Sequence, residues 1–212
     1  MKARRSFFHC YRLTMSKTLY DLAGYSGVTL GFVSTTIQFF RLRKDGTDGV
    51  SLGTWTLFTL TSAFWILYGS LGAHSLQVVL GSLLVWPYQF YIVARLLPLK
   101  NLDIMAKSFG FSFLFTFGPL ALFGWRGGVL GTGAAMTLMC LPQFVSLIKA
   151  KHAEGVSAVG WWVGTLMCLL WTAYYAGNHL WTALVSAIGF GIANMAVAIL
   201  ATLRHVQSHA TA

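Results

Sequence analysis

The sequence predicts an all-α membrane protein built from an internal repeat, and three observations carry that prediction. Of the 212 residues, 56% are hydrophobic and only 9% are charged, whereas soluble domains carry about 25% charged residues. Seven apolar segments have roughly the length that crosses a bilayer. Each must be a helix, because only a helix satisfies its own backbone in lipid. The third observation is an ordered set of residues that occurs twice.

The seven apolar segments divide into two sets of three with one segment left over. The last three match the first three, so the fourth stands alone as a linker. This pattern predicts two parallel three-helix bundles joined by an odd helix (3+1+3). The expected segments are Thr18–Phe40, Val50–Leu71, Ser75–Leu97, Ala106–Gly124, Gly127–Ile148, Val156–Gly177 and Leu180–Leu203. The expected organisation is an N-terminal tail (1–17), a first repeat (18–97), a linker with helix four (98–126), a second repeat (127–203) and a C-terminal tail (204–212).

The repeated pattern runs from Thr36 to Gly69 and again from Leu141 to Tyr175. Each copy has a glutamine in an apolar run, a short basic loop, Gly-Val-Ser, and a Trp-x-x-Tyr late in the next apolar run. A repeat of this length describes the architecture rather than a local feature. The matched positions are Gln38 with Gln143, Phe39 with Phe144, Lys44 with Lys149, Gly49-Val50-Ser51 with Gly155-Val156-Ser157, Trp55 with Trp161, Trp65 with Trp171, and Tyr68 with Tyr174.

The combination of Pro142-Gln143 with Trp171-x-x-Tyr174 resembles the PQ-loop superfamily. That superfamily includes the SWEET and SemiSWEET sugar transporters, the cystinosin-like amino-acid exporters and, more distantly, the KDEL receptor. The resemblance covers roughly Leu19 to Leu203, and it implies a SWEET-like seven-helix transporter that works by alternating access. The first repeat departs from the family, because Ile37-Gln38 stands where the family usually has Pro-Gln.

Pro142 lies inside an apolar run, where proline removes one backbone hydrogen bond and its ring clashes with the carbonyl of Leu138, four residues back. The sequence therefore predicts a kink. The resemblance implies that this kink is a hinge or gate, together with Gln143 and its counterpart Gln38. The alternative is a static kink.

Trp65 and Trp171 are indoles at matching positions of the two repeats, each three residues before a tyrosine, Tyr68 or Tyr174. Two facing indoles can hold a small polar solute, because the aromatic face contacts C–H groups and the N–H donates a hydrogen bond. The resemblance to SWEET-like transporters favours this pocket. The alternative is the belt of Trp and Tyr at the membrane–water interface.

Polar side chains that could complete the pocket lie on the helix after each tryptophan. The family pairs its tryptophan with an asparagine about four turns later, but that spacing here falls on Gly81-Ser82 and Ser186-Ala187. Ser82 and Ser186 can still hydrogen-bond a solute hydroxyl, with fewer partners than an amide. The nearest amides are Gln89 and Asn194. An asparagine in a membrane helix also bonds neighbouring helices, and that alternative stays open.

Lysine and arginine lie mostly in alternate loops, which predicts a cytoplasmic C-terminus and an outside N-terminus in a plasma or inner membrane. The predicted cytoplasmic residues are Arg41, Arg43, Lys44, Arg95, Lys100, Lys107, Lys149, Lys151 and Arg204, against Arg126 alone in the opposite loops. The basic residues of the first fourteen positions oppose this orientation. Either translation starts at Met15, or a basic tail is translocated despite its charge.

The pattern of titratable residues argues against catalysis and proton coupling. Every Asp and Glu maps to a loop or a helix end, and so does the histidine pair His74 and His179. No catalytic or metal-ligand spacing occurs, so we expect no enzymatic activity, cofactor or metal. Cys140 and Cys168 lie in apolar runs and are expected to pack there. The net charge of +10 fits anionic lipid headgroups better than nucleic acid.

These observations predict a facilitator that moves a small neutral polar solute by diffusion through alternating access. A sugar is the leading solute class. A neutral amino acid or related metabolite is the alternative within transport, and a membrane receptor or sorting module with the same fold is the alternative outside it. The expected partners are the solute and the bilayer, and a homo-oligomer is left open.

Overall fold

The computed structural model describes residues 2–97, 102–150 and 154–210, and these residues form helices and turns with no β-strand. The predicted basic residues Lys100 and Lys151 lie outside this described part. The elements are α1 (Lys2–Asp45), α2 (Leu52–Leu67), the π-helical turn η1 (Tyr68–Gly72), α3 (Leu76–Leu83), α4 (Trp86–Leu96), α5 (Leu102–Ser112), the π-helical turn η3 (Phe113–Phe117), α6 (Gly118–Leu138), α7 (Cys140–Lys149), α8 (Ala158–Gly177) and α9 (Trp181–Ala210).

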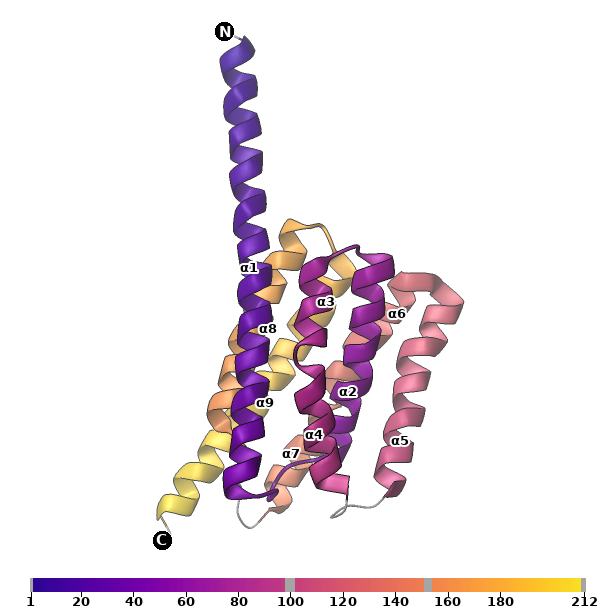
Figure 1. Cartoon of the computed structure of the whole chain (residues 1–212), viewed down its shortest axis with the longest axis vertical. Helices are drawn as coiled ribbons and strands as arrows, with labels where there is room; N and C mark the ends of the chain where they lie inside the picture. Colours follow the sequence, from indigo (N-terminus) through magenta and orange to yellow (C-terminus); the bar gives the residue numbers. More distant parts are fainter. Residues whose placement is uncertain (1, 98–101, 151–153, 211–212) are drawn as a thin grey trace.

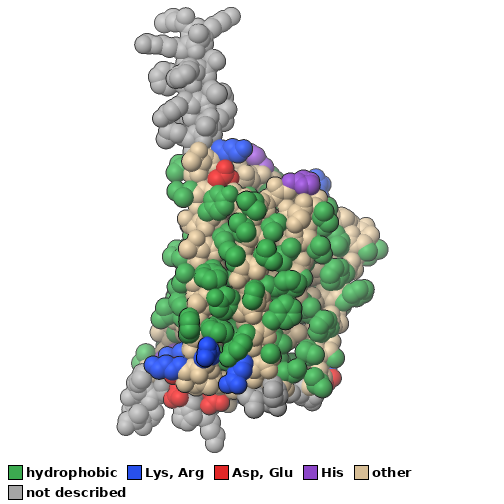
Figure 2. Space-filling model, in the orientation of Figure 1, with side chains coloured by type: hydrophobic (Ala, Val, Ile, Leu, Met, Phe, Trp, Pro, Cys, Tyr) green, Lys and Arg blue, Asp and Glu red, His purple; other side chains and the backbone are tan. Residues whose placement is uncertain are grey.

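The surface has the polarity expected of a membrane protein. Within the described residues, three helical stretches are long and apolar enough to cross a membrane, namely Leu76–Leu96, Leu102–Lys149 and Trp181–Gln207. Figure 2 shows hydrophobic side chains over the middle of the visible face, with charged side chains at both ends and histidine side chains at one of them. We call the end with the Gly49–Ser51 and Gly155–Ser157 turns the inner end, and the end with the His74 and His179 turns the outer end.

Helix α1 is longer than the predicted segment Thr18–Phe40. It begins at Lys2, and Figure 1 shows its first part projecting beyond the other helices at the outer end. Residues 2–17, predicted as a tail, contain no glycine or proline to stop the helix. At the inner end α1 stops at Asp45 because Gly46 adopts a φ of 88°, the left-handed conformation that commonly ends helices.

The repeat in the sequence is also a repeat in conformation. Helices α2 and α8 both begin after a serine, Ser51 or Ser157, whose hydroxyl accepts from the backbone N–H three residues later, at 3.3 Å and 3.0 Å. This is the hydrogen bond of a helix N-cap. At the outer end the chain turns through His74 and His179, which have φ values of 49° and 56°. The Gly-Val-Ser match therefore marks two equivalent helix starts.

Prolines divide two segments that the sequence predicted as continuous. Segment Ser75–Leu97 is split into α3 and α4, and segment Gly127–Ile148 is split into α6 and α7. The first helix of each pair ends four residues before a proline, α3 before Pro87 and α6 before Pro142. Proline clashes with the carbonyl at that position. The predicted kink at Pro142 is therefore an interruption at Met139, and Pro87 causes a similar one in the first repeat.

The predicted linker helix Ala106–Gly124 forms one arm of a helical hairpin with the segment that follows it. Its chain runs through α5, η3 and the start of α6 up to Gly124, and Figure 1 shows the chain reversing direction at the outer end. The reversal includes Gly124, whose φ of 64° and ψ of −156° are not helical. The arms pack closely because Gly127 and Gly131 lie against the backbone carbonyls of Pro119 and Phe115, where a side chain would keep the arms apart.

The helices of the two repeats pack in matching ways. In each repeat the third helix packs against the first and the second: α3 and α4 lie against α1 and α2, and α9 lies against α6, α7 and α8. Between the repeats, α1 packs on α8, while α2 packs on α6 and α7. Helix α5, in the segment predicted as the linker, packs on α2 and α6. The first helix of each repeat thus contacts the second helix of the other, and this arrangement surrounds a cavity.

Candidate functional site

The cavity between the repeats is formed by helices of both. Its volume, measured as the space open to the centres of water molecules, is about 160 Å³, and residues of α1, α2, α3, α4, α6, α8 and α9 line it. Holding one water requires on the order of 10–15 Å³ by this measure, so the cavity has room for a small solute. Helices α5 and α7 contribute no lining residue.

The lining is aromatic, polar and uncharged. Among the described residues that line the cavity, none is Asp, Glu, Lys, Arg or His. The aromatic lining residues are Trp55, Phe58, Trp65, Trp161, Trp171, Tyr175 and Phe190, and the hydroxyl and amide residues are Ser34, Thr35, Gln38, Thr61, Ser62, Ser82, Gln89, Ser186 and Asn194. Groups of this kind hydrogen-bond a neutral solute but supply no opposite charge to balance a charged one.

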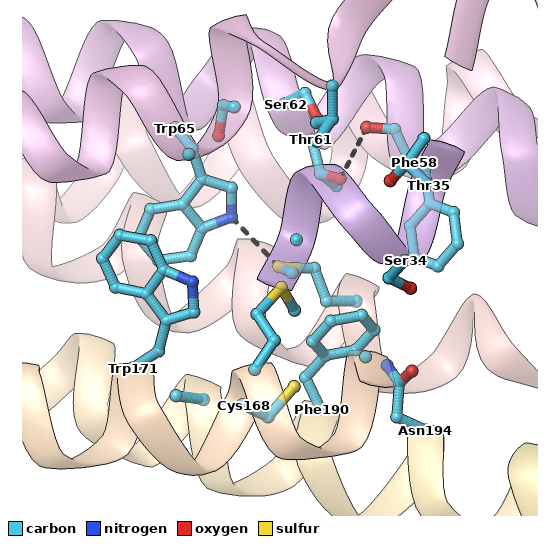
Figure 3. Close-up of a pocket in the computed structure, with 18 of the residues that line it drawn as sticks. Ser34, Thr35, Phe58, Thr61, Ser62, Trp65, Cys168, Trp171, Phe190 and Asn194 are labelled. Carbon is cyan, nitrogen blue, oxygen red and sulfur yellow. Dashed lines mark hydrogen bonds between the residues drawn. The ribbon is translucent and has the colours of Figure 1, made fainter. Parts of the chain in front are cut away.

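Trp65 and Trp171 lie side by side at one end of the cavity (Figure 3). The Nε1–H of Trp65 donates to the sulfur of Met136 at 3.0 Å, which ties the first repeat to the second. The Trp171 ring lies against Gly27 and Gly81, where a Cβ would come within 3.2 Å and 2.7 Å of the indole. Glycine at both positions therefore leaves the space that this indole fills.

Tyr175, which the sequence analysis did not select, stacks with both indoles. Its ring centroid lies 5.4 Å from that of Trp171 at an interplanar angle of 24°, and 6.3 Å from that of Trp65 at 17°. Tyr175 lines the cavity, whereas the predicted Tyr68 and Tyr174 do not. Successive residues of a helix point about 100° apart, so the tyrosine one position after the Trp-x-x-Tyr motif faces the cavity. Counting helical phase from Trp171 could have found it.

The two predicted tyrosines lie at the outer end in different surroundings. The Tyr174 hydroxyl and the Ser75 hydroxyl share a hydrogen bond of 2.8 Å between the repeats. The Tyr68 ring is stacked on Phe64 and contacts Trp125 of the linker hairpin, with ring centroids 6.2 Å and 5.8 Å away. Neither tyrosine lines the cavity, and their assignment as solute-binding residues stays a prediction.

Gln89 and Asn194 both line the cavity, and Figure 3 shows Asn194 at the opposite end from the indoles. The two amides are 105 positions apart, the spacing that also relates His74 to His179, so they occupy matching sites of the repeats. Their exposed fractions are 6% and 4%. Gln89 Oε1 and Asn194 Nδ2 have no hydrogen-bond partner among the described residues, so neither atom supports the alternative that these amides bond neighbouring helices.

The predicted serines line the cavity but differ in their bonding. The Ser186 hydroxyl lies 3.0 Å from the carbonyl oxygen of Thr182 and 3.1 Å from that of Val129. Its single proton is therefore used within the protein. Ser82 has no hydrogen-bond partner in the described part of the chain, which leaves its hydroxyl for a solute.

Gln143 and Gln38 join the repeats at the inner end through matching hydrogen bonds. Gln143 Nε2 donates to the carbonyl of Gly49 at 2.6 Å, and its Oε1 accepts from the N–H of Ser51 at 3.0 Å. In the opposite direction, Gln38 Nε2 donates to Gly155 at 2.7 Å and Oε1 accepts from Ser157 at 2.9 Å. Each glutamine thus binds the Gly-Val-Ser turn of the other repeat. We call these four bonds the glutamine clamp.

A second matching pair of bonds lies just above the glutamine clamp. Thr54 Oγ1 donates to the carbonyl of Met139 at 2.7 Å, and Ser34 Oγ donates to the carbonyl of Gly160 at 2.6 Å. Met139 is the residue at which the helix before Pro142 is interrupted. Pro142 and Gln143 themselves do not line the cavity, whereas Gln38 does. The predicted hinge residues therefore lie at the boundary between the repeats.

Comparisons with protein-family models, with curated proteins and with solved structures found no match to this chain.

Proposed function

We propose that this protein is a membrane transporter that moves a small neutral hydroxylated solute, with a sugar as the leading class. The observation that carries the proposal is the uncharged cavity between the repeats, lined by two matching indoles at one end, by Asn194 at the other end and by its matching amide Gln89. A sugar ring has C–H groups that pack on aromatic faces and hydroxyls that both donate and accept hydrogen bonds.

The unpartnered amide atoms support a bound solute. A buried polar atom without a partner costs about 1–3 kcal/mol, and here the acceptor is Gln89 Oε1 and the donor is Asn194 Nδ2. A hydroxyl can satisfy either group. A neutral metabolite with hydroxyl or amide groups remains a second candidate. A zwitterionic amino acid or a peptide carboxylate is a weaker candidate, because no charged side chain described in the lining would balance its charge.

The helix packing supports a 3+1+3 arrangement of seven membrane helices with α5 in the linker. In this proposal α1, α2 and α3–α4 form one bundle, and the second arm of α6 with α7, α8 and α9 forms the other. The matching contacts of Gln38 and Gln143 support membership of the PQ-loop superfamily. We place the inner end in the cytoplasm, and labelling of single cysteines at Asp45 and Asn178 with membrane-impermeant reagents tests this, since only Asn178→Cys should react in intact cells.

Alternating access would open the inner end by separating the two halves of the glutamine clamp. The interruptions at Met139 and before Pro87 are the sites where the helices could bend, because each proline lacks the N–H that would continue the helical hydrogen bonding. No carboxylate or imidazole lies among the described lining residues. Transport would therefore be facilitated diffusion, and a pH gradient imposed on proteoliposomes should not drive accumulation of the solute.

Ligand-dependent thermal unfolding tests the proposed solute class. Protein in lipid nanodiscs is heated with sugars, polyols, neutral metabolites and amino acids, and a bound solute raises the apparent stability by about 2.7 kcal/mol at 100 times its Kd. Trp171→Ala should abolish the shift. Trp162→Ala is the matched control, because this neighbouring indole is 43% exposed and bonds Thr202 outside the cavity. The proposal is wrong if only charged solutes shift the midpoint, or if both variants lose the shift equally.

The variant Asn194→Leu tests whether the Asn194 amide binds solute or stabilises the fold. Because Asn194 Nδ2 is buried and unpartnered, replacing the amide with an apolar group of similar size should stabilise the ligand-free protein by about 1 kcal/mol. The same change should abolish the solute-dependent shift. A structural amide would give the opposite result, with lower stability of the ligand-free protein.

A further inference from the structure

Three sulfur atoms line the cavity between its two ends. Met136 on α6, and Met167 and Cys168 on α8, are all lining residues. In Figure 3 the Cys168 sulfur lies between the indoles and Asn194. Cys168 is a free thiol with an exposed fraction of 3%. None of these sulfurs is needed to bind the proposed solute.

Each thioether contacts a group of the first repeat. The Met136 sulfur accepts the hydrogen bond from Trp65 Nε1 at 3.0 Å, which holds it next to the indoles. The Met167 sulfur lies against Gly31 of α1, 2.9 Å from the position that a Cβ would occupy. Both sulfurs therefore lie at the boundary between the repeats, and both methionines, like Cys168, belong to the second repeat.

The chemistry of this lining selects one class of metal ion. Thiolate and thioether ligands prefer soft cations such as Cu(I), whereas hard cations need carboxylate or carbonyl oxygens. An uncharged apolar cavity disfavours an isolated ion. A monovalent cation bound to one thiolate forms a neutral pair, so no other charge is needed to balance it.

We propose that Cys168, Met136 and Met167 form a binding site for a soft monovalent cation, Cu(I) or its stable analogue Ag(I). On binding, the S–H bond of Cys168 breaks, its proton passes to the solvent, and a sulfur–metal bond forms without any change of oxidation state. The two thioethers complete a three-sulfur site by donating lone pairs. An ion held there occupies the space between the indole end and the amide end.

Titration of Ag(I) into the purified full-length protein tests the site. The background carries Cys10→Ser, which removes the one other cysteine besides Cys140 and Cys168. One Ag(I) should bind per chain with release of one proton, and Cys168→Ala should lose both signals. Met136→Leu and Met167→Leu should each weaken binding by about tenfold or more. X-ray absorption at the silver edge should report three sulfur neighbours.

Cys140→Ala is the matched control, because its thiol is equally buried but bonds the carbonyl of Met136 and does not line the cavity. It should leave Ag(I) binding unchanged, and Cys168→Ser replaces Cys168→Ala if the alanine variant does not fold. Failure of Ag(I) to bind overturns the proposal. Ag(I) binding that survives the loss of Cys168 also overturns the proposal. So does Ag(I) binding that neither methionine change weakens, because silver bound by the Cys168 thiol alone is a simple thiol adduct. None of these measurements depends on the identity of a transported solute.

Discussion

Gln38 and Gln143 make the same two bonds in opposite directions at the inner end, whereas the matching tyrosines at the outer end have different partners. Tyr174 bonds Ser75 of the other repeat, and Tyr68 packs under Trp125 of the linker. The inner contacts are made to backbone groups, which every residue carries. The outer contacts depend on side chains, which are free to differ between the repeats.

An internal repeat can thus keep symmetric contacts at the inner end, where its two halves bind each other. It loses that symmetry at the outer end, where the linker hairpin packs on one half. The hairpin of α5 and α6 makes the surroundings of the two halves different, and its Trp125 packs on Phe64 and Tyr68 of the first repeat. The consequences can be measured at three pairs of positions.

The largest difference in stability is expected between alanine substitutions at Gly131 and at Gly31. These glycines are the second members of two Gly-x-x-x-Gly pairs. A methyl group at Gly131 would collide with the backbone carbonyl of Phe115, whereas one at Gly31 would meet the flexible end of Met167. Gly131→Ala should lower the free energy of unfolding by about 3 kcal/mol or more, and Gly31→Ala by less than about 1 kcal/mol. Unfolding in mixed detergent micelles measures both. Equal losses would mean that the hairpin does not pack more tightly than the repeat interface.

The next effect concerns the glutamine clamp. Gln143→Met keeps the side-chain volume but leaves the Ser51 N–H and the Gly49 carbonyl without their partner, so the free energy of unfolding should fall by about 2–4 kcal/mol. Gln38→Met should give a loss within about 1 kcal/mol of that value. The double variant should lose less than the sum, because the two turns pack on each other through Gly155. A loss confined to one glutamine would contradict the symmetry of the inner end.

The smallest expected effect is the difference in stability cost between phenylalanine substitutions at the two outer tyrosines. Tyr174→Phe removes the hydrogen bond to Ser75 and should cost about 1 kcal/mol, whereas Tyr68→Phe should cost less than about 0.5 kcal/mol, because the Tyr68 hydroxyl has no partner within the described part of the chain. Ser75→Ala provides the control. It should cost more than Tyr174→Phe, since the Ser75 hydroxyl also caps α3 at the N–H of Val78. Equal costs for the two tyrosine variants would show that the outer end is symmetric after all.

Residue patterns predicted the helical class, because hydrophobic runs act through local geometry, and the Gly-Val-Ser matches marked the starts of α2 and α8. They also placed Trp65 and Trp171 at matching positions, and both indoles line the cavity. They also paired Gln38 with Gln143. They did not predict that each glutamine binds the opposite repeat, because spacing along the chain does not say which helices of two bundles face each other. That information lies in the packing of α1 on α8 and of α2 on α6 and α7.

Two features of the site were within reach of the sequence but were missed. Tyr175 follows the motif tyrosine by one residue, and only helical phase distinguishes the two. The match between Gln89 and Asn194 appears when the 105-residue spacing is extended past His74 and His179. The unpartnered atoms of those amides could not have been predicted, because they depend on what the neighbouring helices fail to supply.

The glutamine clamp also has a consequence for biosynthesis. The partners in its four bonds are separated by 92 to 119 residues of chain. At a synthesis rate of about 5–20 residues per second, the first repeat waits roughly 5–25 s for its counterpart to emerge. During that interval Gln38 and the Gly49–Ser51 turn are exposed to lipid, water or the insertion machinery with no partner of their own. The nascent first half is therefore a waiting intermediate, and its survival depends on how promptly the second half is made.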